Sequence, residues 1–270
     1  MRHGPPLGWL HELAVSRGQG LETSLSAALG KRASVRIVSL VPSVTETLTA
    51  WDRTPIACTR FCERPDLRHI GGTKDPDIDL IAGLSPDLVV MDAEENRRED
   101  HDSLLDRGIA VHVLHVRSLL DVNPSMTELA ERVDARWEPF QLSKDVPRRA
   151  RAFVPIWRNP WIALGAPTYG DSLLSHLGVE NVIAGEGPYP RVALDDIASR
   201  APDVVLAPSE PYPFSKRQLP ELSAIAPTVF VDGKNLFWWG VRSADAVAQL
   251  NCELEVALLN LDSSGGRPFS

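Results

Sequence analysis

Apolar and polar positions repeat along the chain with an offset of 116 residues. The stretch 79–96 reads DLIAGLSPDLVVMDAEEN, and the stretch 195–212 reads DDIASRAPDVVLAPSEPY. In each copy a short helical pattern stops before a Pro-Asp pair, because the residue before proline avoids the helical region. A continuous apolar run follows each pair, at 88–91 and at 204–207. Unbroken runs of this kind are typical of strands that are buried on both faces of a parallel sheet.

Further patterns flank the two copies of the repeat. In chain order they predict a strand at 36–40, a helix at 45–50, a strand at 109–116, a strand at 153–157, a helix at 171–177 and a strand at 228–231. Ser43 and Glu46 form a capping-box pattern at the first helix. Strands that alternate with helices predict right-handed parallel α/β units. The expected fold class is therefore α/β, with two Rossmann-like lobes whose sheets are parallel.

The two copies of the repeat divide the chain into two lobes and a connector. Between the lobes one helix is predicted, at 125–137. The expected organisation is an N-terminal extension at 1–34, lobe one at 35–120, a helical connector at 121–152, lobe two at 153–262 and a tail at 263–270.

Composition narrows the class of protein. The chain has 270 residues, of which 43% are hydrophobic, and a formal net charge of -8. This is an ordinary globular composition, and without a long basic run we expect no nucleic-acid partner. No apolar run approaches the roughly 20 residues that a membrane helix needs, so no membrane span is expected. Residues 1–33 lack the apolar core of a secretory signal, which predicts a cytoplasmic location.

Cysteine and histidine spacing does not predict a metal site. Cys58 and Cys62 are four positions apart in a loop pattern, and without further ligands to complete a zinc set we expect them to be buried or free thiols. Cys252 is the third cysteine. His112 and His115 lie three apart in a strand pattern, where such side chains point to opposite faces of the sheet.

The ends of the predicted strands carry candidate ligand-binding residues. Glu94 and Glu210 occupy matching positions just beyond the two apolar runs of the repeat. Ligands in open parallel sheets lie beyond the carboxyl ends of the strands, so we expect both carboxylates at a cleft between the lobes. Thr73 and Lys74, in a glycine turn of lobe one, are expected near the same cleft.

Aromatic residues gather in predicted loops. Aromatics make up 6% of the chain, and several stand beside proline, which favours exposed loops over core positions. Aromatic side chains with a few polar groups are typical of small-molecule sites. The alternative is packing between elements, which we expect for about half of them. The candidates for ligand contact are Trp157, Trp161, Tyr189, Tyr212, Trp238 and Trp239, with Arg242 close by in the sequence.

Several motifs in order resemble the helical-backbone metal receptors. These are the class III periplasmic-binding proteins, with an Fe/B12-binding domain like that of vitamin B12-binding proteins. The resemblance covers about residues 35–258, and its motifs are IVSLVPSVTETL, PDLVV, LLSHLGVENV, YPRVALDDI and WWGVR. It implies two Rossmann-like lobes joined by one long helix, with a ligand cleft between them. Here Pro124, Pro139 and Pro147 interrupt the connector, which predicts a shorter helix.

The resemblance assigns roles to individual residues. Phe61, Tyr189 and the pair Trp238-Trp239 with Arg242 match aromatic ligand contacts of the family. Two tryptophans of the family fall on Thr73 and Asp92 in this chain. The cleft is therefore expected to be more polar and acidic than in the family, through Glu94, Glu95, Asn96 and Glu210. The resemblance also implies that Asp79 and Asp195 dock the protein on an ABC permease.

The predicted function is that of a substrate-binding protein and not of an enzyme. The expected ligand is a corrinoid or another metal chelate, such as an iron-siderophore, and no intrinsic cofactor is expected. The alternative is a cytoplasmic enzyme or metallocofactor-handling protein on the same fold. For that alternative Glu94 and Glu210 are the acid–base candidates that the repeat supports. A third interpretation is an interaction module that has lost its ligand.

Overall fold

The computed structural model describes residues 35–142 and 146–263, and these form two compact units. Unit 1 contains the residues up to His115 together with Thr127–Arg136. Unit 2 contains Val116–Met126 and the residues from Trp137 onward. The expected extension at 1–34 and residues 264–270 of the expected tail lie outside the described residues. The segment expected as a separate connector, 121–152, is divided between the two units.

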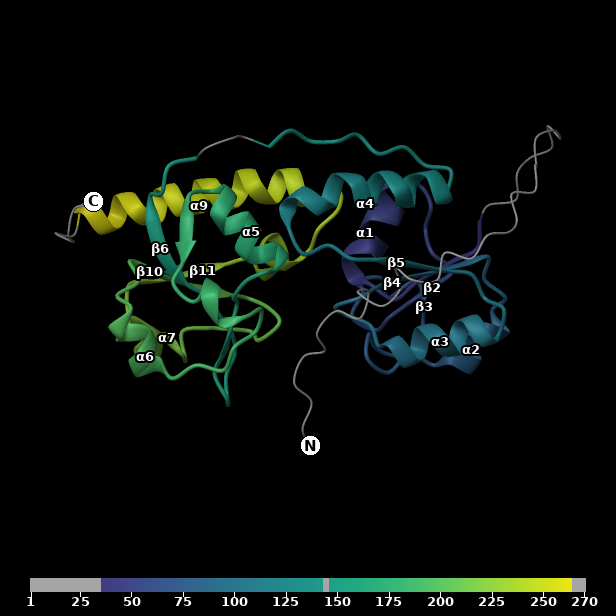
Figure 1. The fold of residues 1–270 in the computed structure, drawn as a ribbon, viewed down its shortest axis with the longest axis horizontal. Helices are drawn as coiled ribbons and strands as arrows, with labels where there is room; N and C mark the ends of the chain where they lie inside the picture. Colours follow the sequence, from purple (N-terminus) through teal and green to yellow (C-terminus); the bar gives the residue numbers. More distant parts are fainter. Residues whose placement is uncertain (1–34, 143–145, 264–270) are drawn as a thin grey trace. The chain divides into compact units, whose positions relative to one another are not determined.

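Unit 1 is built on a parallel sheet with helices on both faces (Figure 1). In spatial order its strands are β3 (Arg68–His69), β2 (Ala57–Cys58), β1 (Ile37–Ser39), β4 (Leu88–Asp92) and β5 (Val111–Leu114). One face is covered by α1 (Pro42–Ala50) and the other by α2 (Ile78–Gly83) and α3 (Arg98–Asp106). Its core consists of buried apolar side chains from these elements: Val38, Leu40, Ala57, Ile70, Ile81, Val89, Met91, Leu104 and Ile109.

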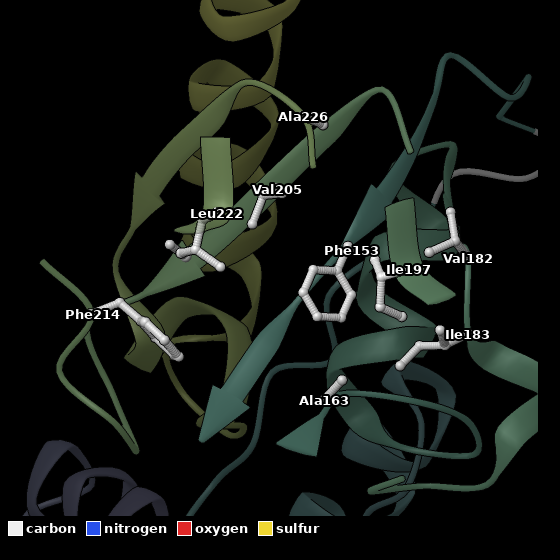
Figure 2. Packing of buried hydrophobic residues seen from close by; sticks show 10 residues of the cluster. Phe153, Ala163, Val182, Ile183, Ile197, Val205, Phe214, Leu222 and Ala226 are labelled. Carbon is white, nitrogen blue, oxygen red and sulfur yellow. The ribbon is translucent and has the colours of Figure 1, made fainter. Parts of the chain in front are cut away.

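Unit 2 contains a second parallel sheet with an added hairpin. The sheet order is β11 (Thr228–Val231), β10 (Val204–Pro208), β6 (Ala150–Phe153) and β9 (Val179–Asn181). Strands β7 (Pro155–Trp157) and β8 (Ile162–Ala163) form an antiparallel pair. The helices are α5 (Tyr169–His176), the short 3-10 helix η2 (Ala184–Glu186), α6 (Leu194–Ser199), α7 (Leu219–Ser223), α8 (Gly233–Phe237) and α9 (Ser243–Ser263). Figure 2 shows one core cluster of this unit, with Phe153 near its middle. The parallel sheets of both units confirm the predicted α/β fold class.

The sequence repeat corresponds to a structural repeat. Shifting α2 and β4 by 116 residues reproduces the bounds of α6 and β10. The Pro-Asp pair has the same task in both copies. Asp87 accepts a hydrogen bond from the backbone N–H of Arg36 at 2.8 Å, and Asp203 accepts one from that of Arg151 at 2.7 Å. Each aspartate therefore ties the start of its own strand to the start of the neighbouring strand.

The two arginines of this repeat complete the arrangement. The guanidinium of Arg36 donates to the carbonyl oxygens of Leu84 and Ser85, and that of Arg151 donates to those of Arg200 and Ala201. These are the carbonyls at the ends of α2 and α6, which have no partner within their helix. The positively charged guanidinium groups satisfy these carbonyls. They also interact favourably with the negative end of the helix dipole.

The start of α1 differs from the predicted capping box. The helix begins at Pro42, and the N-cap residue is Val41, which makes no side-chain capping bond. Proline favours the first helical position because its φ angle is already helical and its missing N–H is not needed there. Ser43 consequently lies inside the first turn and does not cap the helix.

The connector helix also differs from the prediction. Helix α4 spans Leu119–Arg132 and contains Pro124 in its interior, whereas the proline was expected to exclude the first turn. An interior proline costs about 3 kcal/mol because it removes a hydrogen bond and strains the turn. Burial outweighs this cost, since apolar side chains at helical spacing are buried on both sides of Pro124: Leu119, Val122, Met126, Leu129 and Val133.

The strand expected at 153–157 is divided into two. Residues up to Phe153 belong to β6 in the sheet, and Pro155 begins the β7–β8 hairpin. Proline cannot donate a ladder hydrogen bond, which favours a position outside a central strand. The division directs Trp157 into the hairpin and away from the sheet ladder.

Candidate functional site

In unit 1 the strand order reverses between β1 and β4, and two buried polar residues occupy this place. The carboxyl ends of such adjacent strands form the usual ligand-binding edge of an open parallel sheet. Asn96 donates through Nδ2 to the carbonyl of Leu40, just after β1, at 3.2 Å, and to that of Thr73 at 2.9 Å. Its Oδ1 accepts from the backbone N–H of Asp92, the last residue of β4, at 2.8 Å. Asn96 therefore joins three segments at this edge.

Asp92 orients the acidic residues that follow β4. Its Oδ1 accepts from the backbone N–H groups of Glu94 at 2.8 Å and Glu95 at 3.1 Å. Lys74 donates through Nζ to the carbonyl of Glu94 at 2.8 Å. Although the Lys74 side chain as a whole is exposed, shielding of its ammonium group lowers its pKa, and the charges of Glu95, Asp92 and Glu94 oppose this effect. The structure thus places Lys74 among the predicted carboxylates of unit 1.

Phe61 lies in an exposed turn of unit 1. Its side chain is 53% exposed, and the Arg60 guanidinium lies over its ring at 4.8 Å. Arg60 forms two hydrogen bonds of 3.1 Å to the carboxylate of Asp75. Its backbone N–H donates to the carbonyl of Gly71 at 2.8 Å. Gly71 has a φ of 98°, and a Cβ there would lie 2.4 Å from the carbonyl oxygen of Asp75, so this turn requires glycine.

In unit 2 the strand order reverses between β6 and β10, and aromatic side chains meet there. Trp157, at the end of β7, and Tyr212, four residues after β10, contact edge to face with ring centres 5.6 Å apart. Tyr212 lies 4.8 Å from Phe214, and Phe214 stacks on Trp161 at 6.0 Å. We call these four residues the aromatic cluster. It continues from the buried core, where Phe214 is 6% exposed, to Trp157, which is 44% exposed.

Charged and glycine residues hold the aromatic cluster and Glu210 in place. Arg158 lies 5.8 Å from the ring of Trp161 and forms a two-fold hydrogen bond with Glu221, at 2.7 and 3.2 Å. Glu210 is half-buried beside the start of α8. Gly233 packs so closely that a Cβ on it would lie 2.7 Å from the backbone of Glu210. Glycine at this position therefore sets where Glu210 lies.

A second aromatic side chain of unit 2 is accompanied by cations. Lys234 and Arg242 each lie 5.3 Å from the ring of Trp238. Arg242 also donates to Asn235 at 3.2 Å. Tyr189 is half-buried in a loop whose neighbouring carbonyls accept hydrogen bonds from Ala163 and Gly165 in and after β8.

Two predicted ligand contacts turn inward. Asn96 is 0% exposed with all of its amide groups bonded to the protein, and Trp239 is 4% exposed. Trp239 ends a run of aromatic residues that we expected to be exposed. After the end of α8, however, Trp238 is half-buried and Trp239 enters the core. Both residues therefore support the candidate site from the protein interior. They are no longer candidates for direct ligand contact.

The structure also adds a role for Asp92 and two residues that sequence reasoning missed. Asp92 orients Glu94 and Glu95, Phe214 anchors the aromatic cluster, and Lys234 accompanies Trp238. Phe214 lies two positions after Tyr212 in the same loop, and this proximity in the sequence could have identified it. Lys234 has no signal in the sequence, because its proximity to Trp238 depends on the turn of α8.

The predicted docking aspartates occupy equivalent places in the two units. Asp79 and Asp195 lie in the first turns of α2 and α6. Both are exposed, and Asp79 forms an ion pair of 2.6 Å with Arg107.

His112 is a buried histidine of unit 1. Within 35–142 and 146–263, no group of three or more His, Cys, Asp or Glu side chains is arranged to hold a metal ion. His112 is buried in β5, and its Nδ1 lies 3.8 Å from Glu128. Burial, aided by the charge of Arg132, lowers the pKa of His112 to about 4, while Glu128 opposes the shift.

We expect His112 to make folding stability depend on pH. An unfolded histidine titrates near 6.5, so between about pH 6.5 and 4 the unfolded chain binds a proton that the folded chain excludes. The contribution is complete above pH 6.5 and is lost as the pH falls toward 4, by about 2 kcal/mol between pH 7.5 and 5. Denaturant unfolding at both pH values measures it.

The variant His112→Leu should remove this pH-dependent part. The exposed His69→Gln serves as the matched control and should retain the wild-type difference. An unchanged difference in His112→Leu would assign the pH dependence to other groups.

The two parallel α/β units match the two-lobed fold of periplasmic binding proteins. The structure resembles the periplasmic vitamin B12-binding protein BtuF of Vibrio cholerae, with a TM-score of 0.67, 19% identity and coverage of 82% of this chain and 97% of that chain. It also resembles the periplasmic heme-binding protein BhuT in complex with two hemes, with a TM-score of 0.69, 22% identity and coverage of 84% and 100%.

Sequence comparison agrees with the structural likeness. The chain is 24% identical over 199 residues to the vitamin B12-binding protein of Yersinia pestis (strain Pestoides F), which covers 66% of this chain and 71% of that protein. No family model matches the chain. The similarities confirm the resemblance to the class III periplasmic-binding-protein family. The names of these proteins describe binding proteins, which does not favour the enzyme or metallocofactor-handling alternative.

The predicted cytoplasmic location is wrong. The structural neighbours are periplasmic proteins, which contradicts it. The prediction rested on the composition of residues 1–33, which lie outside the described residues. Separately, no helix in the described part of the chain is long and apolar enough to cross a membrane.

Proposed function

We propose that this protein is an extracytoplasmic substrate-binding protein for a metal chelate of the corrinoid or heme class. The observation that carries the proposal is the aromatic cluster at the strand reversal of unit 2, where Trp157 contacts Tyr212. Small-molecule sites in open α/β sheets lie at such reversals and are lined by aromatic side chains with a few polar groups.

The chemistry of the cluster suits a flat macrocycle. Corrin and porphyrin rings present wide apolar faces, which pack on aromatic side chains as aromatic rings pack on one another. Trp157 is 44% exposed while the core holds its neighbours, so the cluster offers a rigid platform. Rigid residues lose little conformational entropy on binding.

Charges near the second aromatic site suit the periphery of such a ligand. Lys234 and Arg242 beside Trp238 would form charge-assisted hydrogen bonds with carboxylate or phosphate groups. Within unit 1 itself, Glu94 and Glu95 carry acceptors for amide or ammonium groups. Relatives and structural neighbours named for vitamin B12 and heme support this ligand class.

Titration with hemin, cyanocobalamin, cobinamide and a ferric siderophore tests the proposal. We expect quenching of tryptophan fluorescence by a macrocycle, and for hemin a shift of its absorbance. In Trp157→Ala the affinity should fall roughly three- to tenfold, the value of one aromatic contact. Phe230→Ala is the matched control, because Phe230 is a similarly exposed aromatic of unit 2 on β11.

The titrations also separate the two ligand sources. Binding of hemin alone would assign the heme class, and binding of cobalamin or cobinamide alone would assign the corrinoid class. The proposal fails if neither hemin nor a corrinoid binds with a Kd below about 1 mM, which is roughly -4 kcal/mol, even if the ferric siderophore binds.

We also propose that an ABC permease is the partner and that Asp79 and Asp195 contact it. The support is their matching exposure in the first turns of α2 and α6. The double variant Asp79→Lys with Asp195→Lys should reduce transport in cells several-fold, because exposed charge pairs contribute up to about 1 kcal/mol each. Ligand affinity of the purified variant should stay unchanged. Unchanged transport would exclude both residues from docking.

A further inference from the structure

An ion pair of unit 2 joins the turn of the β7–β8 hairpin to α7. Arg158 is the first residue of this turn, at 158–161, and Glu221 lies in the first turn of α7. The guanidinium of Arg158 donates through Nη2 and Nε to the two carboxylate oxygens of Glu221, at 2.7 and 3.2 Å. Such a two-fold bond fixes direction as well as distance, because both groups are planar. The pair therefore sets where the turn lies relative to α7.

Helix α7 is itself fixed to the core of unit 2. Leu222, the residue after Glu221, is 0% exposed and belongs to the same core cluster as Phe214 (Figure 2). The backbone N–H groups of Glu221 and Leu222 both donate to the carbonyl of Gln218, at 3.1 Å. The side chain of Gln218 accepts in turn from the backbone N–H of Ser215 at 3.1 Å. Glu221 is thus a rigid partner for the hairpin turn.

The hairpin turn separates the two tryptophans of the aromatic cluster. Trp157 precedes Arg158, and Trp161 ends the turn. The ring of Trp161 stacks on Phe214 with an angle of 6° between the planes, and the guanidinium of Arg158 lies 5.8 Å from it. Trp157 is 44% exposed and meets Tyr212 edge to face, with ring centres 5.6 Å apart. The position of Trp157 therefore depends closely on where the turn holds its backbone.

We propose that Arg158 and Glu221 are positioning residues that hold Trp157 against Tyr212 in the arrangement that binds ligand. The proposal rests on the ligand-binding function proposed above and adds two residues that contribute to affinity without contacting the ligand. Two nitrogen atoms of Arg158 already bond to Glu221, and the two charges compensate each other. A charge that a bound ligand covers costs less free energy when it is paired, so the pair suits a place beside an apolar ligand face.

The ion pair should act on the hairpin and not on the stability of the whole unit. Its two side chains are 30% and 39% exposed, and ion pairs that water reaches contribute little to global stability. A side chain that is already ordered loses less conformational entropy when a ligand binds. Breaking the pair is therefore expected to loosen Trp157 and to lower affinity, while the unfolding transition stays nearly unchanged.

Fluorine NMR of the ligand-free protein tests the position of Trp157. The full chain is labelled with 5-fluorotryptophan, and Trp157→Phe identifies the Trp157 resonance. We expect this resonance to shift or broaden in Arg158→Gln and in Glu221→Gln, which break the pair from either side. The exchanged pair Arg158→Glu with Glu221→Arg should restore most of the wild-type resonance. An unchanged resonance in both single variants would overturn the proposal.

Arg148→Gln is the matched control for the loss of one ion pair. Arg148 forms a comparable ion pair of 2.8 Å with Glu180 on β9, in the same unit. The control should leave the Trp157 resonance unchanged and should change the unfolding transition as little as Arg158→Gln does. A shift of equal size in the control would show a general effect of charge and would overturn the assignment to Arg158.

A double-mutant cycle with hemin, cyanocobalamin and cobinamide tests the action on binding. For a macrocycle that binds the wild-type protein, affinity should fall roughly threefold in Arg158→Gln, within the loss expected for Trp157→Ala. In the Trp157→Ala background, Arg158→Gln should cause no further loss, because its effect acts through Trp157. An equal loss in that background would make Arg158 a direct ligand contact, and this result would overturn its role as a positioning residue.

The two measurements separate this proposal from the proposed function. If none of the macrocycles binds the wild-type protein, the proposed function fails, and fluorine NMR still decides whether the ion pair positions Trp157. If Trp157→Ala weakens binding and Arg158→Gln does not, the proposed function stands and the positioning role is excluded.

Discussion

Replacing Asn96 with alanine is expected to lower the free energy of unfolding by about 3 kcal/mol or more. The side chain is fully buried and makes hydrogen bonds to Leu40, Thr73 and Asp92. Alanine would leave two carbonyls and one N–H without these partners, and a buried polar group without a partner costs about 1–3 kcal/mol. Denaturant unfolding with the change followed by circular dichroism measures the loss.

Two further variants sharpen this test. Asn96→Asp keeps the shape and the acceptor for Asp92, but it loses both donors and places a second carboxylate beside Asp92, so it should destabilise as well. Asn251→Ala is the matched control, because the Asn251 side chain donates a solvent-exposed hydrogen bond to Glu255 one turn further along α9. It should change stability by less than about 0.5 kcal/mol. If Asn96→Ala were equally mild, Asn96 would not organise this edge.

Replacing Glu94 or Glu210 with glutamine is expected to weaken ligand binding tenfold to a hundredfold. A charged hydrogen bond contributes about 1.5–3 kcal/mol, and glutamine keeps the size of glutamate without its charge. Both side chains are half-buried at the carboxyl edges of their sheets. Stability should stay nearly unchanged. Isothermal titration with the ligand that the fluorescence titrations identify measures the affinity.

A matched control separates local contact from net charge. Glu99→Gln removes the same charge from an exposed position in the first turn of α3. It should bind like the wild-type protein. If the Glu94 and Glu210 variants also bind normally, both carboxylates are solvent-facing groups, and the acidic contribution to binding is excluded while the aromatic contribution stands.

The sequence alone determined the repeated α/β pattern. The helix, Pro-Asp pair and apolar strand at 78–92 recur at 194–208, and the structure has elements with these bounds. Such local signals suffice because an unbroken apolar run has few stable environments other than a buried strand. The same alignment placed Glu94 and Glu210 just beyond their strands, since position after a strand follows directly from chain order.

Tertiary structure decided which side chains face inward. Asn96 and Trp239 resembled surface contacts, yet both are buried, and α4 continues through Pro124. In each case the deciding energy comes from partners distant in the sequence, such as Leu40 for Asn96. Local propensity contributes a few tenths to about 3 kcal/mol, and burial against such partners can exceed it. Position in the sequence therefore indicated the carboxyl edges of the two sheets. Tertiary packing alone decided which side chains point outward at those edges.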